Sequence, residues 1–169
     1  VEHLAGAVTG IWQAASWQQK EQAVDFYGLK GIVEQLLHNL HLNDGIQYVA
    51  TETRRNMHPG QTADIYVGET LVGFMGQIHP QVAQQNHLAA TFVFELDMTQ
   101  LQALAATPVV YQPVAKYPAV TRDIALLVDR HVQHQAIVAA IYAKGGAFLQ
   151  DVTLFDLYEG HNVAPGKKS

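Results

Sequence analysis

Hydrophobic positions in the first part of the chain follow helical spacing in one segment and alternate with polar positions in several others. After Asp25, apolar residues recur every three or four positions, which predicts an amphipathic helix capped by this aspartate and ending near residues 43–45. This order of elements predicts an α+β fold in which helices pack on an antiparallel sheet. The other predicted elements are strands at 4–11, 46–51, 63–67, 71–78 and 91–96 and short helices at 81–88 and 97–105.

Two glycines lie inside the predicted helix. Gly28 and Gly31 each cost a helix about 1 kcal/mol relative to alanine, so helix propensity does not explain them. We therefore expect both glycines to allow close packing against a neighbouring element.

A stretch at 108–116 contains prolines and lacks a helical period, so we predict a linker there. The linker separates a unit at 1–107 from a unit at 117–169. The elements predicted in the second unit are a strand at 122–129, a helix at 133–144 and a strand at 149–158. This order is the β-α-β half of a ferredoxin-like sandwich.

Composition narrows the class of protein. The chain has 169 residues, of which 49% are hydrophobic and 15% charged, and this balance predicts folded domains rather than disorder. The chain has no cysteine, so it has neither disulfides nor thiolate metal ligands. No apolar run approaches the roughly 20 residues that span a bilayer, and the first residues do not resemble a signal peptide. We expect a cytoplasmic protein with no membrane partner.

The charge is unevenly divided between the two parts of the chain. The net charge is −5 in total. Residues 1–111 carry four basic against ten acidic side chains, whereas residues 112–169 carry six basic against five acidic ones. Because neutralisation of phosphates supplies most non-specific affinity for nucleic acids, any RNA contact is expected in the second part.

The nine histidines do not predict a metal or acid-base centre. His38 and His41 share a helix without a carboxylate at the spacing that would complete a metal site, so we expect surface or helix-end roles for them. Glu34 lies four residues before His38, a spacing at which the two side chains can pair. His58 and His79 each precede a proline at an element boundary, where the imidazole is expected to bond a backbone group.

No catalytic set emerges from the other residues. Arg54 and Arg55 are expected on a solvated edge of the protein rather than in a phosphate clamp, since neighbouring side chains point in opposite directions. We therefore predict neither catalytic residues nor a metal site.

The second unit offers a candidate binding face. If its predicted strands form one sheet, Ala125, Asp156 and Tyr158 lie on the face away from the helix. Such a face suits an unpaired guanine: Ala125 leaves room, Asp156 accepts hydrogen bonds from N1–H and the exocyclic amine, and Tyr158 offers a stacking surface. In the alternative reading, Asp156 pairs with a lysine and Tyr158 packs against the protein.

Three short motifs in the second unit match one known protein family. Their matching positions are Tyr117, Pro118, Arg122, Asp123, Ala125, Leu154, Phe155, Asp156, Tyr158, Gly160, Gly166, Lys168 and Ser169. On these motifs the second unit resembles the C-terminal domain of bacterial phenylalanyl-tRNA synthetase β subunits. The resemblance implies a ferredoxin-fold anticodon-binding domain in which Ala125, Asp156 and Ser169 lie near the first anticodon base. Ser169 falls where the third strand of that domain begins, so the strands at 122–129 and 149–158 are expected to lack their common neighbour.

Residues 1–107 are similar to the preceding module of the same family, which has a class II synthetase fold without catalysis. The matching motifs are Asp25-Phe26-Tyr27, Leu29-Lys30-Gly31, His58-Pro59-Gly60-Gln61, Gly73, Gly76 and Ile78-His79-Pro80. The resemblance implies that this module packs on the catalytic α subunit of an α2β2 heterotetramer. That enzyme joins phenylalanine to its tRNA with ATP and magnesium, and none of these cofactors is expected in this part of it. The alternative is a separate RNA-binding or protein-interaction module that shares the anticodon-binding fold.

Overall fold

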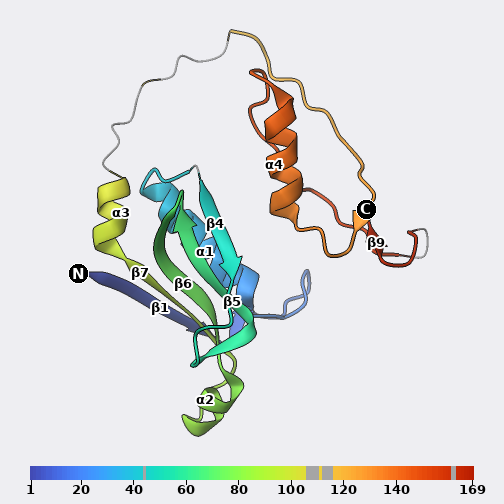
Figure 1. The fold of residues 1–169 in the computed structure, drawn as a ribbon. Helices are drawn as coiled ribbons and strands as arrows, with labels where there is room; N and C mark the ends of the chain where they lie inside the picture. Colours follow the sequence, from blue (N-terminus) through green and yellow to red (C-terminus); the bar gives the residue numbers. More distant parts are fainter. Residues whose placement is uncertain (44, 106–110, 112–115, 161–162) are drawn as a thin grey trace. The chain divides into compact units, whose positions relative to one another are not determined.

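A five-stranded antiparallel sheet forms the centre of the first unit (Figure 1). The computed structural model of the chain describes residues 1–43, 45–105, 111, 116–160 and 163–169. Across the sheet the strands are β1 (His3–Thr9), β7 (Thr91–Asp97), β6 (Thr70–Ile78), β5 (Met57–Val67) and β4 (Ile46–Ala50). Two short strands, β2 (Ile11–Gln13) and β3 (Gln22–Ala23), form a separate ribbon. The predicted α+β fold class is confirmed.

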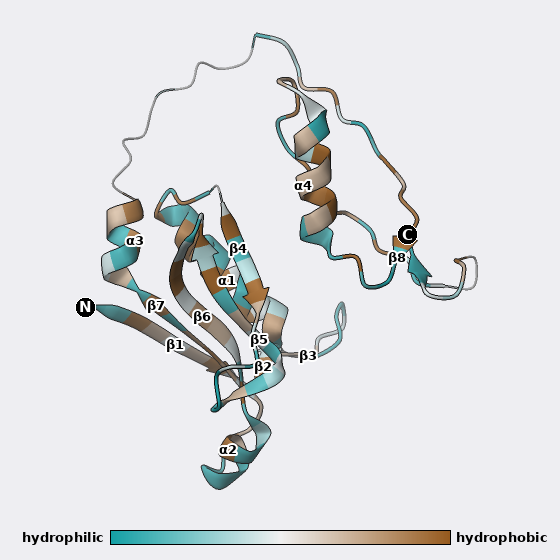
Figure 2. Cartoon of the chain, viewed as in Figure 1, coloured by the Kyte–Doolittle hydropathy of each residue, from teal (hydrophilic) through white to brown (hydrophobic). Residues whose placement is uncertain are grey.

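Helix α1 (Phe26–Asn39) packs against this sheet and buries one of its faces. The Asp25 side chain accepts a hydrogen bond from the Gly28 amide at 2.7 Å, as expected of an N-cap. Within the first unit, hydrophobic residues lie along the sheet strands and along α1 (Figure 2). The fully buried residues of this core are Leu29, Val33, Leu37, Ile65, Val72, Met75, Leu96 and Leu101. Burial of this apolar surface is the main source of stability in the first unit.

The first unit differs from the predicted elements mainly at element ends. Helix α1 ends at Asn39, earlier than predicted, because His41 adopts the left-handed conformation (φ 60°) that terminates helices. Strand β5 begins at Met57 rather than at residue 63. Its pairing with β6 is interrupted by a register shift between Met57 and Thr62, which accommodates the proline in this stretch.

The two remaining helices of the first unit are short. Helix α2 (Pro80–Gln85) begins after His79, and helix α3 (Met98–Leu104) begins after Asp97, whose carboxylate accepts from the Gln100 amide at 3.0 Å. Helix α2 ends before the predicted residue 88, and His87 just beyond it has a φ of 55°. None of the described helices is long and apolar enough to cross a membrane.

The chain divides into two compact units, residues 1–112 and residues 113–169. The described elements of the second unit are β8 (Val128–Asp129), α4 (His134–Gly145) and β9 (Lys167–Lys168). The predicted linker at 108–116 lies outside the described residues except for Tyr111 and Lys116, so it stays a prediction.

The two strands predicted in the second unit are largely absent. Only Val128 and Asp129 of the predicted strand 122–129 join a ladder, and residues 149–158 form no assigned strand. The register pairs Val128 with Lys168 and Asp129 with Lys167, which places Leu127 opposite Ser169. Among the described residues, none pairs with residues 122–126 in a ladder, and an unpaired backbone does not make a strand.

The second unit also lacks a buried core among its described residues. No residue of α4 is buried, although Ile137, Val138 and Ile141 are half-buried. Phe155 is 74% exposed, and Ile124 is 64% exposed. The buried hydrophobic residues of the described chain all lie in the first unit.

Candidate nucleic-acid interface

The end of the chain brings two of the predicted site residues together. Ser169 and Tyr158 exchange two backbone hydrogen bonds, Tyr158 N to Ser169 O at 2.7 Å and Ser169 N to Tyr158 O at 3.0 Å. Because β9 pairs with β8 on its other side, residues 167–169 lie between the segment at 128–129 and the segment ending at Tyr158. We expected the segments 122–129 and 149–158 to lack a strand between them. This expectation is wrong for residues 128–129 and for Tyr158, because residues 167–169 pair with both.

Strand alternation assigns the side chains around this junction to two faces. Tyr158 and Ser169 are directly opposite each other in an antiparallel pair, so their side chains share a face. Lys167 and Asp129 lie on that face too, and the Lys167 ammonium donates to Asp129 Oδ1 at 3.0 Å. We call this face, with Tyr158, Ser169, Lys167 and Asp129, the base face.

A second ion pair lies on the opposite face. Arg130 donates to the Glu159 carboxylate, and these two residues adjoin Asp129 and Tyr158 in sequence. The hydrogen bond from Arg130 lowers the pKa of Glu159, and the hydrogen bond from Lys167 lowers the pKa of Asp129. Both carboxylates are exposed to solvent, so each ion pair contributes little stability. Together they link the chain at 128–130 to residues 159 and 167.

Neither Asp156 nor Ala125 takes part in the backbone pairing that joins Tyr158 to Ser169. Asp156 accepts a hydrogen bond from the Leu157 amide at 2.8 Å, and both Asp156 and Ala125 are exposed. Within the described residues, no hydrogen bond or ion pair joins Asp156 to a lysine. If these segments continued as strands, alternation would place Asp156 on the base face with Tyr158, and Ala125 there with Leu127.

The arginine pair considered in the sequence analysis includes one residue, Arg54, that makes structural contacts. Arg54 Nε and Nη2 donate to Asp64 Oδ1 at 2.8 and 2.7 Å, and the guanidinium lies 3.9 Å from the Phe74 ring centroid. The expectation of a solvated edge is therefore wrong for Arg54. Among the described residues, no group of three or more histidine, aspartate or glutamate side chains is arranged to hold a metal ion.

The histidines mostly bond backbone or neighbouring side chains. His58 Nδ1 accepts from the Gly60 amide at 3.0 Å and His79 Nδ1 from the Gln81 amide at 3.2 Å, which confirms the expectation for both. His38 and Glu34 do not pair with each other, although their spacing allows it. His38 contacts Asn43, while Glu34 binds the Lys30 ammonium at 2.7 Å.

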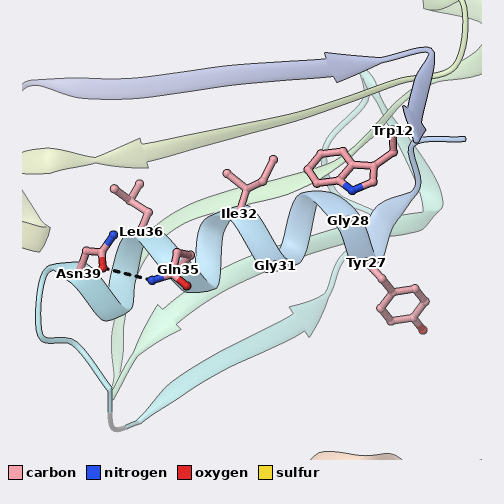
Figure 3. Close-up of a pocket in the computed structure, with 8 residues that line it drawn as sticks. All are labelled: Trp12, Tyr27, Gly28, Gly31, Ile32, Gln35, Leu36 and Asn39. Atoms are coloured by element: carbon pink, nitrogen blue, oxygen red, sulfur yellow. Dashed lines mark hydrogen bonds between the residues drawn. The ribbon is translucent and has the colours of Figure 1, made fainter. Parts of the chain in front are cut away.

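A shallow, open groove of about 630 Å³ runs along the outer side of α1 (Figure 3). Trp12, 51% exposed, lies over the helix on the same side as Ile32 and Leu36, and Tyr27 points away from them. The groove is lined by Trp12, Tyr27, Gly28, Gly31, Ile32, Gln35, Leu36 and Asn39. We call this feature the α1 groove.

The two glycines of α1 do not pack against a neighbouring element of the described chain. A Cβ built on Gly31 has no described atom within 4 Å, and a Cβ on Gly28 meets only Asp25 Oδ1, at 3.3 Å. The expectation of close packing within this chain is therefore wrong for both. Gly28 leaves room for the N-cap, and Gly31 is open to solvent at the floor of the α1 groove.

Comparison with known proteins identifies two domain families in the chain. Residues 1–98 match the family model described as the phenylalanyl tRNA synthetase beta chain CLM domain. Residues 115–169 match the ferredoxin-fold anticodon binding domain. The two matches cover the two units of the structure.

Curated relatives extend well beyond this chain. A phenylalanine–tRNA ligase beta subunit from Lactiplantibacillus plantarum is 51% identical over 169 residues, which is 100% of this chain and 21% of the relative. The subunit of the same name from Bacillus subtilis is 46% identical over 168 residues, 99% of this chain and 21% of the relative. The chain thus spans about a fifth of the length of these relatives, 21%. Together, these matches show that the chain belongs to the phenylalanyl-tRNA synthetase beta chain family.

Proposed function

We propose that the chain is the part of a phenylalanine–tRNA ligase β subunit that contacts the α subunit and reads the tRNA anticodon. The proposal is carried by the pairing of Ser169 with Tyr158, which brings two of the predicted base-reading residues onto one face. The complete enzyme is an α2β2 assembly in the cytoplasm that attaches phenylalanine to its tRNA with ATP and magnesium. Within this enzyme, the chain recognises the tRNA anticodon and binds the α subunit, and the α subunit carries out catalysis.

The base face has the chemistry to bind an unpaired guanine. The Asp156 carboxylate accepts hydrogen bonds from N1–H and the exocyclic amine, which together distinguish guanine from the other bases. The Tyr158 ring, 45% exposed, stacks on the base, and Ala125 leaves room for it. The Ser169 hydroxyl both donates and accepts hydrogen bonds, and Lys167 supplies positive charge near the RNA backbone.

The isolated chain is expected to show no phenylalanine-dependent exchange between ATP and pyrophosphate. Arg54 is engaged by Asp64 and Phe74, and the described residues hold no cluster suited to magnesium. Adenylate formation requires cations that neutralise the triphosphate, so the reaction should remain at background. The assay uses the purified 169-residue chain with and without the α subunit. Robust exchange by the chain alone would show that it is catalytic.

The α1 groove is the surface that we assign to the α subunit. It exposes a tryptophan and a tyrosine, Trp12 and Tyr27, and residues of these two types are enriched among those that dominate binding energy at interfaces. Gly31 leaves the backbone of α1 open at the floor of the groove, so a partner side chain can approach closely. The occupant is apolar, because Ile32 and Leu36 form the wall beside Trp12.

Replacing Gly31 by alanine should have opposite effects on the free chain and on the assembly. Alanine should stabilise α1 by about 0.5–1 kcal/mol, since no described atom lies within 4 Å of the new Cβ. The same methyl group should weaken association with the α subunit about tenfold, because it fills space that the partner occupies. Thermal unfolding of the free chain and titration of the complete β subunit with α subunit measure the two effects.

Gly60→Ala is the matched control for this experiment. A Cβ at Gly60 makes only an ordinary contact, 3.5 Å from His58 Cε1, and Gly60 lies outside the α1 groove. It should leave association unchanged. If Gly31→Ala assembled as tightly as the unsubstituted subunit, the α1 groove would not be the interface.

A further inference from the structure

The ring of Tyr158 lies directly against the backbone of Gly160. A Cβ built on Gly160 would be 2.8 Å from Tyr158 Cε2 and closer still to its Cζ and hydroxyl oxygen. Separations of this size are too short for a real Cβ, so any larger residue at this position would displace the ring. Tyr158 and Gly160 are two residues apart, as expected of side chains on one face of an extended segment.

The φ angle of Gly160 does not itself require glycine. Six glycines of the described chain have a positive φ, and Gly160 is not among them. A left-handed φ is therefore not the reason for glycine at this position. The space taken by the Tyr158 ring is the feature of this position that excludes a side chain.

Two contacts connect the residues around the ring to other parts of the unit. Tyr158 makes two backbone hydrogen bonds with Ser169, and the side chain of Glu159, between Tyr158 and Gly160, is bound by Arg130. The direction of the Tyr158 side chain relative to this backbone depends on what lies beside it. An open position at Gly160 lets the ring lie along the chain instead of projecting freely into solvent.

We propose that Gly160 is a positioning residue for base recognition, which holds the Tyr158 ring along the base face so that the first anticodon base stacks on it. The inference rests on the proposed function and adds a residue that touches no base. A ring that is already oriented loses less conformational freedom when the base binds, so Gly160 acts by preorganisation.

The test uses the complete β subunit assembled with its α subunit and carrying Gly160→Ala. We expect the KM for phenylalanine tRNA to rise about fivefold, the lower end of what one base–aromatic stack contributes. The kcat and the phenylalanine-dependent ATP–pyrophosphate exchange should not change. Gly60→Ala, in the other unit, is the control and should leave all three quantities unchanged.

A tRNA lacking the first anticodon base separates positioning from a general structural effect. We expect the difference between Gly160→Ala and the unsubstituted enzyme to disappear with this abasic tRNA. An equal rise in KM for intact and abasic tRNA would overturn the inference. If the unsubstituted enzyme bound both tRNAs equally well, the proposed anticodon site itself would be wrong.

The double variant Tyr158→Ala with Gly160→Ala keeps the test decisive even if the single glycine variant folds poorly. Removing the ring removes the clash, so the double variant is expected to fold as well as Tyr158→Ala. If Gly160 acts only through Tyr158, the two variants will have the same KM for tRNA. A further rise in the double variant would show that Gly160 acts through something other than the ring.

Discussion

Amide hydrogen exchange in the 169-residue chain should differ between the two units by about a thousandfold or more. Amides of α1 and β6 should be protected, because these elements surround the buried core of Leu29, Leu37 and Met75. Amides at 122–129 and 149–158 should exchange nearly as fast as in an unfolded peptide. The ladder there is two residues long, and no described side chain of α4 is buried beside it.

The control for this experiment lengthens the chain at Ser169 with added residues that continue β9. A longer β9 would pair with residues 122–127 in the existing register and complete the sheet between both segments. Protection should then appear across the second unit while the first stays unchanged. Equal protection of both units in the unextended chain at high dilution would contradict this account.

The main elements of the first unit could be predicted because their sequence patterns involve residues that are close together in the chain. The helical spacing after Asp25 and the capping aspartate both lie within α1 or beside it, so neither depends on distant residues. The end of α1 was predicted less well because His41, rather than a glycine, takes the left-handed conformation. Arg54 was misjudged because Asp64 and Phe74 become neighbours only when β5 pairs with β6.

The second unit shows the limit of alternation as a signal. The pattern at 122–129 is that of a strand, but a strand also needs a partner, and the described ladder supplies one only for Val128 and Asp129. The spacing of Asp156 and Tyr158 places them on one face only where the chain is extended as a strand. The packing of the Tyr158 ring on Gly160 depends on a side-chain direction, which spacing does not determine.

Replacing Asp156 by alanine in the complete enzyme should raise the KM for phenylalanine tRNA. Loss of a bidentate contact to a guanine edge corresponds to about 1–3 kcal/mol, or roughly a 5- to 150-fold change in KM. Phenylalanine-dependent ATP–pyrophosphate exchange should be unchanged, because we assign catalysis to the α subunit. Steady-state aminoacylation and exchange assays on the same preparation measure both quantities.

Asp151→Ala is the charge-matched control for this substitution. Asp151 lies in the same segment, and among the described residues its carboxylate bonds only its own neighbours, Val152 at 2.8 Å and Thr153 at 3.0 Å. Removing a negative charge by itself favours RNA binding, so this variant should bind tRNA at least as well as the unsubstituted enzyme. A rise in KM with Asp156→Ala alone would therefore reflect a specific contact. Unchanged tRNA KM together with loss of exchange would make Asp156 structural.

Guanine and inosine at the first anticodon position test the central claim most directly, because inosine lacks only the exocyclic amine that Asp156 is proposed to bind. The KM of each tRNA is measured with the unsubstituted enzyme and with Asp156→Ala. We expect the unsubstituted enzyme to prefer the guanine tRNA and the variant to treat the two tRNAs alike. An equal preference for guanine in both enzymes would contradict the claim that this face reads the anticodon.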